Sequence, residues 1–201
     1  MAKNTGLALE NEVYQVVSNL VKNNNFILAN PYVKVHKKKG YYSKDRESNI
    51  IFDVTVEKYW EDPDTHPGIK PALIVVIECK DYAHSVPVDD VEEFHAKLQQ
   101  IGADNTKGMM ITRKGSFQPG ALTYANSKNI GIARVLPHDQ LDFLLHMLTV
   151  NSFSNIANPY ADAHSIVNAL TNRDYRSDNG QSFFSMTCES SLENMVKKLL
   201  Q

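Results

Sequence analysis

The chain has 201 residues, of which 42% are hydrophobic and 22% are charged, and its formal net charge is −2. This composition is ordinary for a globular protein and excludes a largely disordered chain, and the length suits one domain with an appendage. Because there is no basic excess, any contact with nucleic acid must come from a local basic patch. Cys79 and Cys188 form no zinc motif, and no apolar run is long enough to span a membrane. We expect a soluble, cytoplasmic protein with reduced thiols.

The first half of the chain predicts one helix followed by three strands. The helix is indicated by apolar residues at helical spacing: Leu9, Val13, Val16, Val17, Leu20 and Val21. Asn4 or Thr5 can cap its start, and the asparagines at 23–25 end it. Strands are expected at residues 31–39, 49–57 and 73–80. A basic segment within residues 36–46 leads into the second strand, and a proline-rich loop at 60–71 precedes the third.

In the second half, helices and strands alternate. The expected elements are a helix at 89–103, a strand at 108–112, a helix at 118–128, a strand at 130–135 and a helix at 139–150. This order is typical of an α/β fold in which a mixed central β-sheet is flanked by helices. The composition shifts at residue 151, so we expect a domain at 1–150 and a C-terminal extension at 151–201. The extension should hold a helix at 163–170, a turn at 178–180, a strand at 182–187 and a last helix from Ser191.

Charged residues occur within two of the predicted strands. Strict alternation places Ile50, Phe52, Val54 and Val56 on one face of the second strand, and Asp53, Thr55 and Glu57 on the other. In the third strand, Glu78 and Lys80 share the face of Ile74 and Val76. If the two strands pair, Asp53 joins Glu78 and Lys80 in one pocket. Two carboxylates and an amine suit a divalent, oxygen-seeking cation such as Mg²⁺.

A simpler interpretation exists for each piece, since charged residues often end a strand where it meets water. A Glu-x-Lys triplet is also common by chance. Aspartate, however, is depleted in strands, yet Asp53 occupies the middle of the apolar run "NIIFDVTVE". A buried carboxylate there needs a partner, and a metal ion is a natural one. The combination therefore favours a chemical role over a strand boundary.

Asp53 followed by Glu78-Cys79-Lys80, within an αβββαβ order, resembles the PD-(D/E)xK nucleases, and specifically their Mrr-type restriction endonuclease-like branch. The stretch "GLALENEVYQVV" is similar to the opening helix of that branch, whose glutamate faces the metal. Glu10 takes that position, with Glu12 as the alternative. The stretch "KGMMITRKGSFQPGALTYANSKNIGIARV" resembles the later strand, short helix and closing strand. The resemblance covers about residues 5 to 136, although Phe52 stands where the family motif has proline.

The resemblance implies a Mg²⁺-dependent DNA endonuclease, in which Mn²⁺ can substitute, acting in DNA restriction or host defence. Asp53, Glu78 and the backbone carbonyl of Cys79 would bind the metal, Lys80 would position or activate water, and Glu10 would complete the site. A homodimer is expected, because cutting both DNA strands needs two sites. The rival interpretations are a structure-specific repair or junction nuclease, and a nuclease-like fold that only binds DNA, or a partner protein through residues 151–201.

The basic segment "HKKKGYYSKDR" has two interpretations. Its lysines could be the solvated edge of a hairpin, where they would discourage aggregation. Alternatively, they contact DNA phosphates while Tyr41 and Tyr42 pack on sugar or base. We favour DNA contact, because an acidic protein that holds DNA needs one concentrated basic region. The candidate residues are Lys37, Lys38, Lys39, Lys44 and Arg46.

Overall fold

A computed structural model describes residues 5–22, 32–135, 163–175, 183–185 and 199–200. Its elements in chain order are α1 (Thr5–Lys22), β1 (Val33–Ser43), β2 (Ser48–Lys58), β3 (Leu73–Lys80), α2 (Val88–Gly102), β4 (Thr106–Thr112), α3 (Pro119–Ser127), β5 (Gly131–Val135), α4 (Ala163–Thr171) and β6 (Phe183–Ser185). The predicted helix at 139–150, the turn at 178–180, the domain boundary at 150 and nearly all of the last helix lie outside the described residues. Within the described part of the chain, no helix is both long and apolar enough to cross a membrane.

The six strands form one mixed sheet in the order β1-β2-β3-β4-β5-β6. The pairs β1–β2, β2–β3 and β5–β6 are antiparallel, whereas the pairs β3–β4 and β4–β5 are parallel. The parallel pairs require crossovers, which α2 and α3 supply. The predicted α/β class and the αβββαβ core are therefore confirmed.

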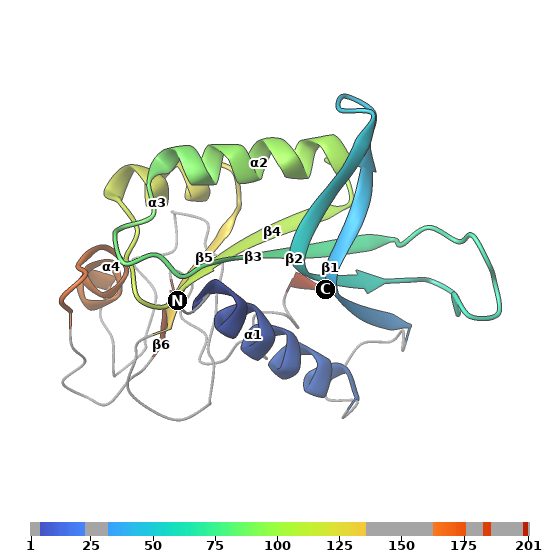
Figure 1. Ribbon diagram of the computed structural model, residues 1–201, viewed down its shortest axis with the longest axis horizontal. Helices are drawn as coiled ribbons and strands as arrows, with labels where there is room; N and C mark the ends of the chain where they lie inside the picture. The colour runs from blue at the N-terminus through green and yellow to red at the C-terminus, as the bar shows by residue number, and fades with distance from the viewer. Residues whose placement is uncertain (1–4, 23–31, 136–162, 176–182, 186–198, 201) are drawn as a thin grey trace.

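Helices cover both faces of the sheet, with α1 on one face and α2 and α3 on the other (Figure 1). The predicted apolar face of α1 packs on one core, where Leu9, Val13 and Val17 meet Val75 and Ile77. On the other face, the side chains of α2 pack closely on β4. A Cβ atom at Gly108 would lie 2.3 Å from Leu98 Cδ1, so any other residue there would force side chains of α2 to shift.

The described parts of the C-terminal region pack against the same sheet. Arg134 of β5 is 2% exposed, and its guanidinium donates hydrogen bonds to the carbonyls of Ala169, Asn172 and Arg173 at the end of α4. A cation that binds the last carbonyls of a helix stabilises its C-terminus. Leu199 and Leu200 are buried in the core beneath α1. These segments therefore extend the fold of the preceding residues.

Strand β1 is longer than the sequence predicted, since it runs to Ser43 and not to residue 39. The lysine-rich stretch is thus mostly strand, and only residues 44–47 form the turn into β2. Lysine has low strand propensity, but pairing with the apolar strand β2 overrides it.

The prediction that Ile50, Phe52, Val54 and Val56 share one face was wrong. Ile50 and Phe52 pack in the core beneath α2, whereas Val54 and Val56 pack in the core beneath α1. The change of face occurs at Asp53. Opposite it in β1, Lys38 has a φ of 52°, in the left-handed region. The residue pairs on either side, Lys37 with Val54 and Lys39 with Phe52, keep the same register. Both strands therefore change the face of their side chains at the same point, and strict alternation fails there.

Candidate active site

The candidate site begins where β2 and β3 stop pairing. Their ladder runs from Lys58 opposite Leu73 to Val54 opposite Ile77. At the next position, Oδ2 of Asp53 accepts the backbone N–H of Cys79 at 2.8 Å, in place of a strand-to-strand bond. The Asp53 side chain is only 14% exposed. A carboxylate is therefore fixed at the point where the two strands separate.

Glu78 and Lys80 point toward α2, on the face of Ile74 and Val76, as predicted. The Lys80 ammonium lies 3.6 Å from Glu78 Oε1 and 3.5 Å from Asp90 Oδ1 of α2. It also donates to the Tyr82 hydroxyl at 3.4 Å. Lys97, also on α2, is 4.0 Å from Glu78 Oε1. The glutamate therefore lies between two ammonium groups.

Burial and charge act in opposite directions on these groups. Burial raises the pKa of Glu78, and the negative charge of Asp53 raises it further. Burial alone would lower the pKa of Lys80, but the charges of Glu78 and Asp90 raise it above its ordinary value. Lys80 is thus an ammonium, suited to donate hydrogen bonds and offset negative charge.

Glu10 of α1 reaches the site from the other face of the sheet through Lys38. The Lys38 ammonium lies 2.9 Å from Glu10 Oε2 and 2.5 Å from Asp53 Oδ1. Burial would lower the pKa of Lys38, but these two carboxylates raise it well above its ordinary value. The alternative residue, Glu12, pairs instead with Arg113. The geometry therefore brings Glu10, and not Glu12, to Asp53.

The donor set suits a hard cation, although its side chains are not assembled around one point. Among the residues that the structure describes, no three His, Cys, Asp or Glu side chains are grouped closely enough to hold a metal ion. Glu10 Oε2 is nevertheless buried, and the Lys38 ammonium at 2.9 Å compensates its charge. Carboxylate and carbonyl oxygens are the ligands that Mg²⁺ prefers. Asp53, Glu78 and Glu10, with the Cys79 carbonyl, are the residues that could hold Mg²⁺.

The residues predicted to contact DNA have different surroundings in the structure. Lys37 donates to Asn11 on α1, and Lys38 pairs with the site carboxylates. Lys44 and Arg46 are exposed in the turn between β1 and β2. The pKa of Glu93 on α2 is lowered chiefly by Lys97, with smaller contributions from Lys80 and Arg46. Of the two tyrosines, Tyr42 is 61% exposed. Tyr41 points inward, so only Tyr42 is free to pack on a nucleotide.

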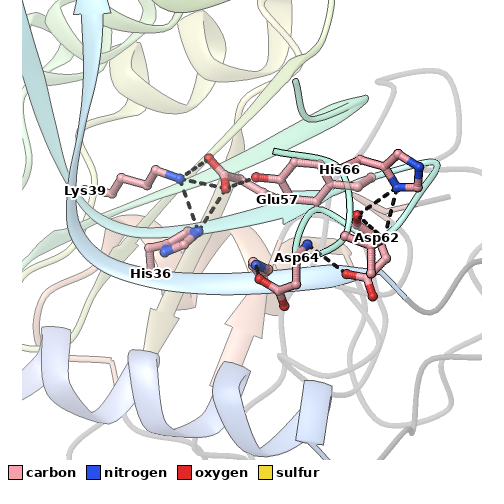
Figure 2. Close-up of polar contacts among 9 residues, drawn as sticks. His36, Lys39, Glu57, Asp62, Asp64 and His66 are labelled. Carbon is pink, nitrogen blue, oxygen red and sulfur yellow. Dashed lines mark hydrogen bonds and ion pairs between the residues drawn. The ribbon is translucent and has the colours of Figure 1, made fainter. Parts of the chain in front are cut away.

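Lys39 belongs to a second cluster, which the sequence did not indicate (Figure 2). At its centre, Glu57 is 1% exposed. Its carboxylate accepts hydrogen bonds from Lys39 at 2.7 and 2.8 Å, from Tyr41 at 2.7 Å, from Tyr59 at 2.6 Å and from His36 at 2.9 Å. These donors fill the acceptor capacity of the carboxylate. The cluster therefore fixes β1 to β2 and leaves no lone pair for a ligand.

Sequence reasoning missed three groups at the site. Asp90 and Lys97 lie seven residues apart on α2, so they share its face toward Glu78, and their helical spacing could have shown this. The position of Lys38 had no signal in the sequence, because it depends on the left-handed backbone and on the change of face at Asp53.

An αβββαβ core that places Asp53, Glu78 and Lys80 where two central strands diverge defines the PD-(D/E)xK superfamily. The family model described as "Restriction endonuclease" (Mrr_cat) matches residues 17–142, and the chain belongs to this family. The matched range includes Asp53, Glu78 and Lys80 but not Glu10. No curated protein matches the chain.

Among solved structures, the chain is similar to the crystal structure of a protein of unknown function, AF1548, with 14% identity and a TM-score of 0.41. The alignment covers 60% of this chain and 56% of that chain, so it spans little more than half of AF1548.

Proposed function

We propose that this protein is a Mg²⁺-dependent DNA endonuclease that hydrolyses phosphodiester bonds in DNA restriction or host defence. The observation that carries the proposal is the match to a restriction endonuclease family over residues 17–142, which include Asp53, Glu78 and Lys80. The end of the β2–β3 pairing next to Asp53 supports the proposal, because the two strands separate beside these residues. We also propose that residues 1–150 form the nuclease domain, and that residues 151–201 extend it.

Each residue has a role in this proposal. Asp53, Glu78 and the backbone carbonyl of Cys79 hold the cation, and Glu10 completes the set directly or through water. A bound Mg²⁺ would supply Lewis acidity and make an attacking water more acidic. As an ammonium beside Glu78, Lys80 donates hydrogen bonds to the attacking water and offsets negative charge on the phosphate. Mn²⁺ should substitute for Mg²⁺, because both take oxygen ligands.

One observation favours the alternative that the protein binds DNA without cutting it. The Lys38 ammonium already compensates the charges of Glu10 and Asp53, so these buried carboxylates have a partner without a metal. A plasmid-nicking assay with and without Mg²⁺ or Mn²⁺ separates the two functions. Nicking that requires the metal and is lost in Lys80→Met supports the nuclease. Tight DNA binding without nicking in either metal overturns it.

A further inference from the structure

Lys38 is placed between two carboxylates that belong to different elements. Its ammonium is 2.5 Å from Oδ1 of Asp53 on β2 and 2.9 Å from Oε2 of Glu10 on α1. The two carboxylates are 14% and 12% exposed, whereas the Lys38 side chain is 45% exposed. A partly solvent-exposed cation therefore reaches inward to neutralise two largely buried anions.

The backbone is distorted at the residue that makes these contacts. Lys38 has a φ of 52°, a left-handed conformation that is unfavourable for a non-glycine residue. The distortion brings Lys37 and Lys38, which are consecutive, to the same side of the sheet as α1. Regular alternation would have put them on opposite faces. The conformation that costs energy is thus the one that directs Lys38 at the acidic pair.

The position of Lys38 conflicts with a metal at the same oxygens. One oxygen of Asp53 is engaged by the Cys79 N–H, and the Lys38 ammonium takes the other. A divalent ion coordinated by these carboxylates at roughly 2.0–2.6 Å would lie close to the Lys38 ammonium, and the two cations would repel each other. The ion and Lys38 therefore compete for Glu10 and Asp53.

We propose that Lys38 is an internal counter-cation that holds Glu10 and Asp53 together in the metal-free protein, and that a divalent ion must displace it to bind. The proposal rests on the proposed metal site and adds the competition for it. Displacement costs the two ion pairs, so Lys38 lowers the affinity of the site for the metal. The exposed side of its stem leaves Lys38 a path to solvent when it is displaced.

The test compares Lys38→Met with Lys37→Met in calorimetric titrations of the DNA-free protein with Mn²⁺. Both variants lose one positive charge at adjacent positions, but Lys37 donates to the neutral side chain of Asn11. Lys37→Met therefore measures the general effect of charge. We expect Lys38→Met to bind Mn²⁺ at least about tenfold more tightly than the wild type, and Lys37→Met to change affinity less than about twofold. Equal effects of the two substitutions would overturn the proposal.

Thermal unfolding gives a second readout that does not depend on activity. In EDTA, Lys38→Met should melt several degrees below the wild type, because Glu10 and Asp53 then repel each other without a counter-cation. Saturating Mn²⁺ should restore it and raise its melting temperature more than that of the wild type. If Lys38→Met does not fold in EDTA, Lys38→Gln, which is neutral but can still donate to both carboxylates, takes its place with the same expected affinity gain.

The outcomes separate this proposal from the one on which it rests. Mn²⁺ binding that is equally tight in the wild type, Lys38→Met and Lys38→Gln leaves the metal site intact and rejects displacement. An absence of Mn²⁺ binding in every variant rejects the metal site itself, and displacement with it.

Discussion

The carboxylate of Asp53 accepts the backbone N–H of Cys79 at 2.8 Å, so one candidate metal ligand also connects β2 to β3. The same carboxylate holds the Lys38 ammonium through its other oxygen. Two substitutions can separate this structural role of Asp53 from its proposed role as a metal ligand.

Asp53→Asn should abolish Mn²⁺ binding but keep an oxygen that accepts the Cys79 N–H. Asp53→Ala should abolish Mn²⁺ binding as well and also leave that N–H without its acceptor, at an additional cost of about 1 kcal/mol. Both variants remove the Asp53 charge that repels Glu78, so this effect cancels when their stabilities are compared. Calorimetric titration gives the affinity, and urea unfolding gives the stability. Unchanged Mn²⁺ affinity in Asp53→Asn would remove Asp53 from the metal site.

The sequence predicted most of the fold because the apolar periodicity of these elements agrees with their burial. Strand 73–80 was predicted with its observed bounds, and the apolar face of α1 was correct, since Leu9, Val13, Val17 and Leu20 are buried. The helix over 89–103 differs by one residue at each end. The helices each have a single apolar face, and the continuous apolar run of strand 73–80 matches its burial on both faces of the sheet.

The change of face at Asp53 could not be predicted, because it depends on how β1 and β2 pair and not on the sequence of either strand alone. Nothing in the local sequence of Lys38 requires a left-handed backbone, and glycine, the residue that favours it, occurs at position 40. The cluster around Glu57 was missed for a related reason. His36, Lys39 and Tyr41 belong to β1, whereas Glu57 and Tyr59 lie 16 or more residues further along the chain. Only the observed register brings these side chains together.

Lys80→Met tests the chemical role of the ammonium. The variant keeps much of the aliphatic stem, so its packing should change little, and the metal ligands remain. We expect cleavage under single-turnover conditions with saturating Mg²⁺ to fall on the order of a hundredfold or more. Mn²⁺ should still bind. Lys114→Met is the matched control, since Lys114 is 45% exposed and pairs with Asp81. Cleavage at the wild-type rate in Lys80→Met would exclude Lys80 from the mechanism.

The exposed turn between β1 and β2 should contribute most of the basic contacts to DNA. Lys44→Ala combined with Arg46→Ala is expected to weaken binding to all sequences alike. It should also flatten the dependence of log affinity on log salt by up to about 2, at roughly 0.9 for each lost phosphate contact. Fluorescence anisotropy at salt concentrations from about 50 to about 200 mM, without added metal, measures both the DNA affinity and its salt dependence.

Two comparisons control this measurement. Lys70→Ala with Lys128→Ala removes the same charge outside the hairpin and should change the slope little. Lys39→Ala should lower stability more than DNA affinity, because the Lys39 ammonium is bound to Glu57. An unchanged slope in the Lys44 and Arg46 variant would make these residues a solvated turn only.

Arg134→Met should loosen the described C-terminal segments from the sheet. The substitution removes donors from three carbonyls at the end of α4, which we expect to cost about 2 kcal/mol. For a chain of this size, that corresponds to a fall in Tm of roughly 4–8 °C. Arg173→Met, which removes an exposed arginine next to the same turn, is the control and should shift Tm by less than about 1 °C. Equal Tm values for the two variants would show that Arg134 does not stabilise the fold.

The Glu57 cluster predicts a specific loss of stability in acid. Burial acts to raise the pKa of Glu57, but the hydrogen bonds from His36, Lys39, Tyr59 and Tyr41 hold it well below its ordinary value of 4.5. A carboxylate whose pKa is lowered by folding stabilises the protein above the unfolded pKa, and this contribution is lost as pH falls toward the folded pKa.

Glu57→Gln removes this contribution, so the difference in unfolding free energy between wild type and variant isolates it. That difference should be constant above about pH 5.5 and then shrink by about 1.4 kcal/mol for each pH unit below 4.5. Urea unfolding between pH 3 and 7 measures it. Asp64→Asn, which removes a carboxylate that is 77% exposed and paired with Lys34, should show a difference near zero throughout. A difference for Glu57→Gln that does not vary between pH 3 and 5.5 would mean that folding leaves the pKa of Glu57 unchanged, and that its four donors do not stabilise the carboxylate.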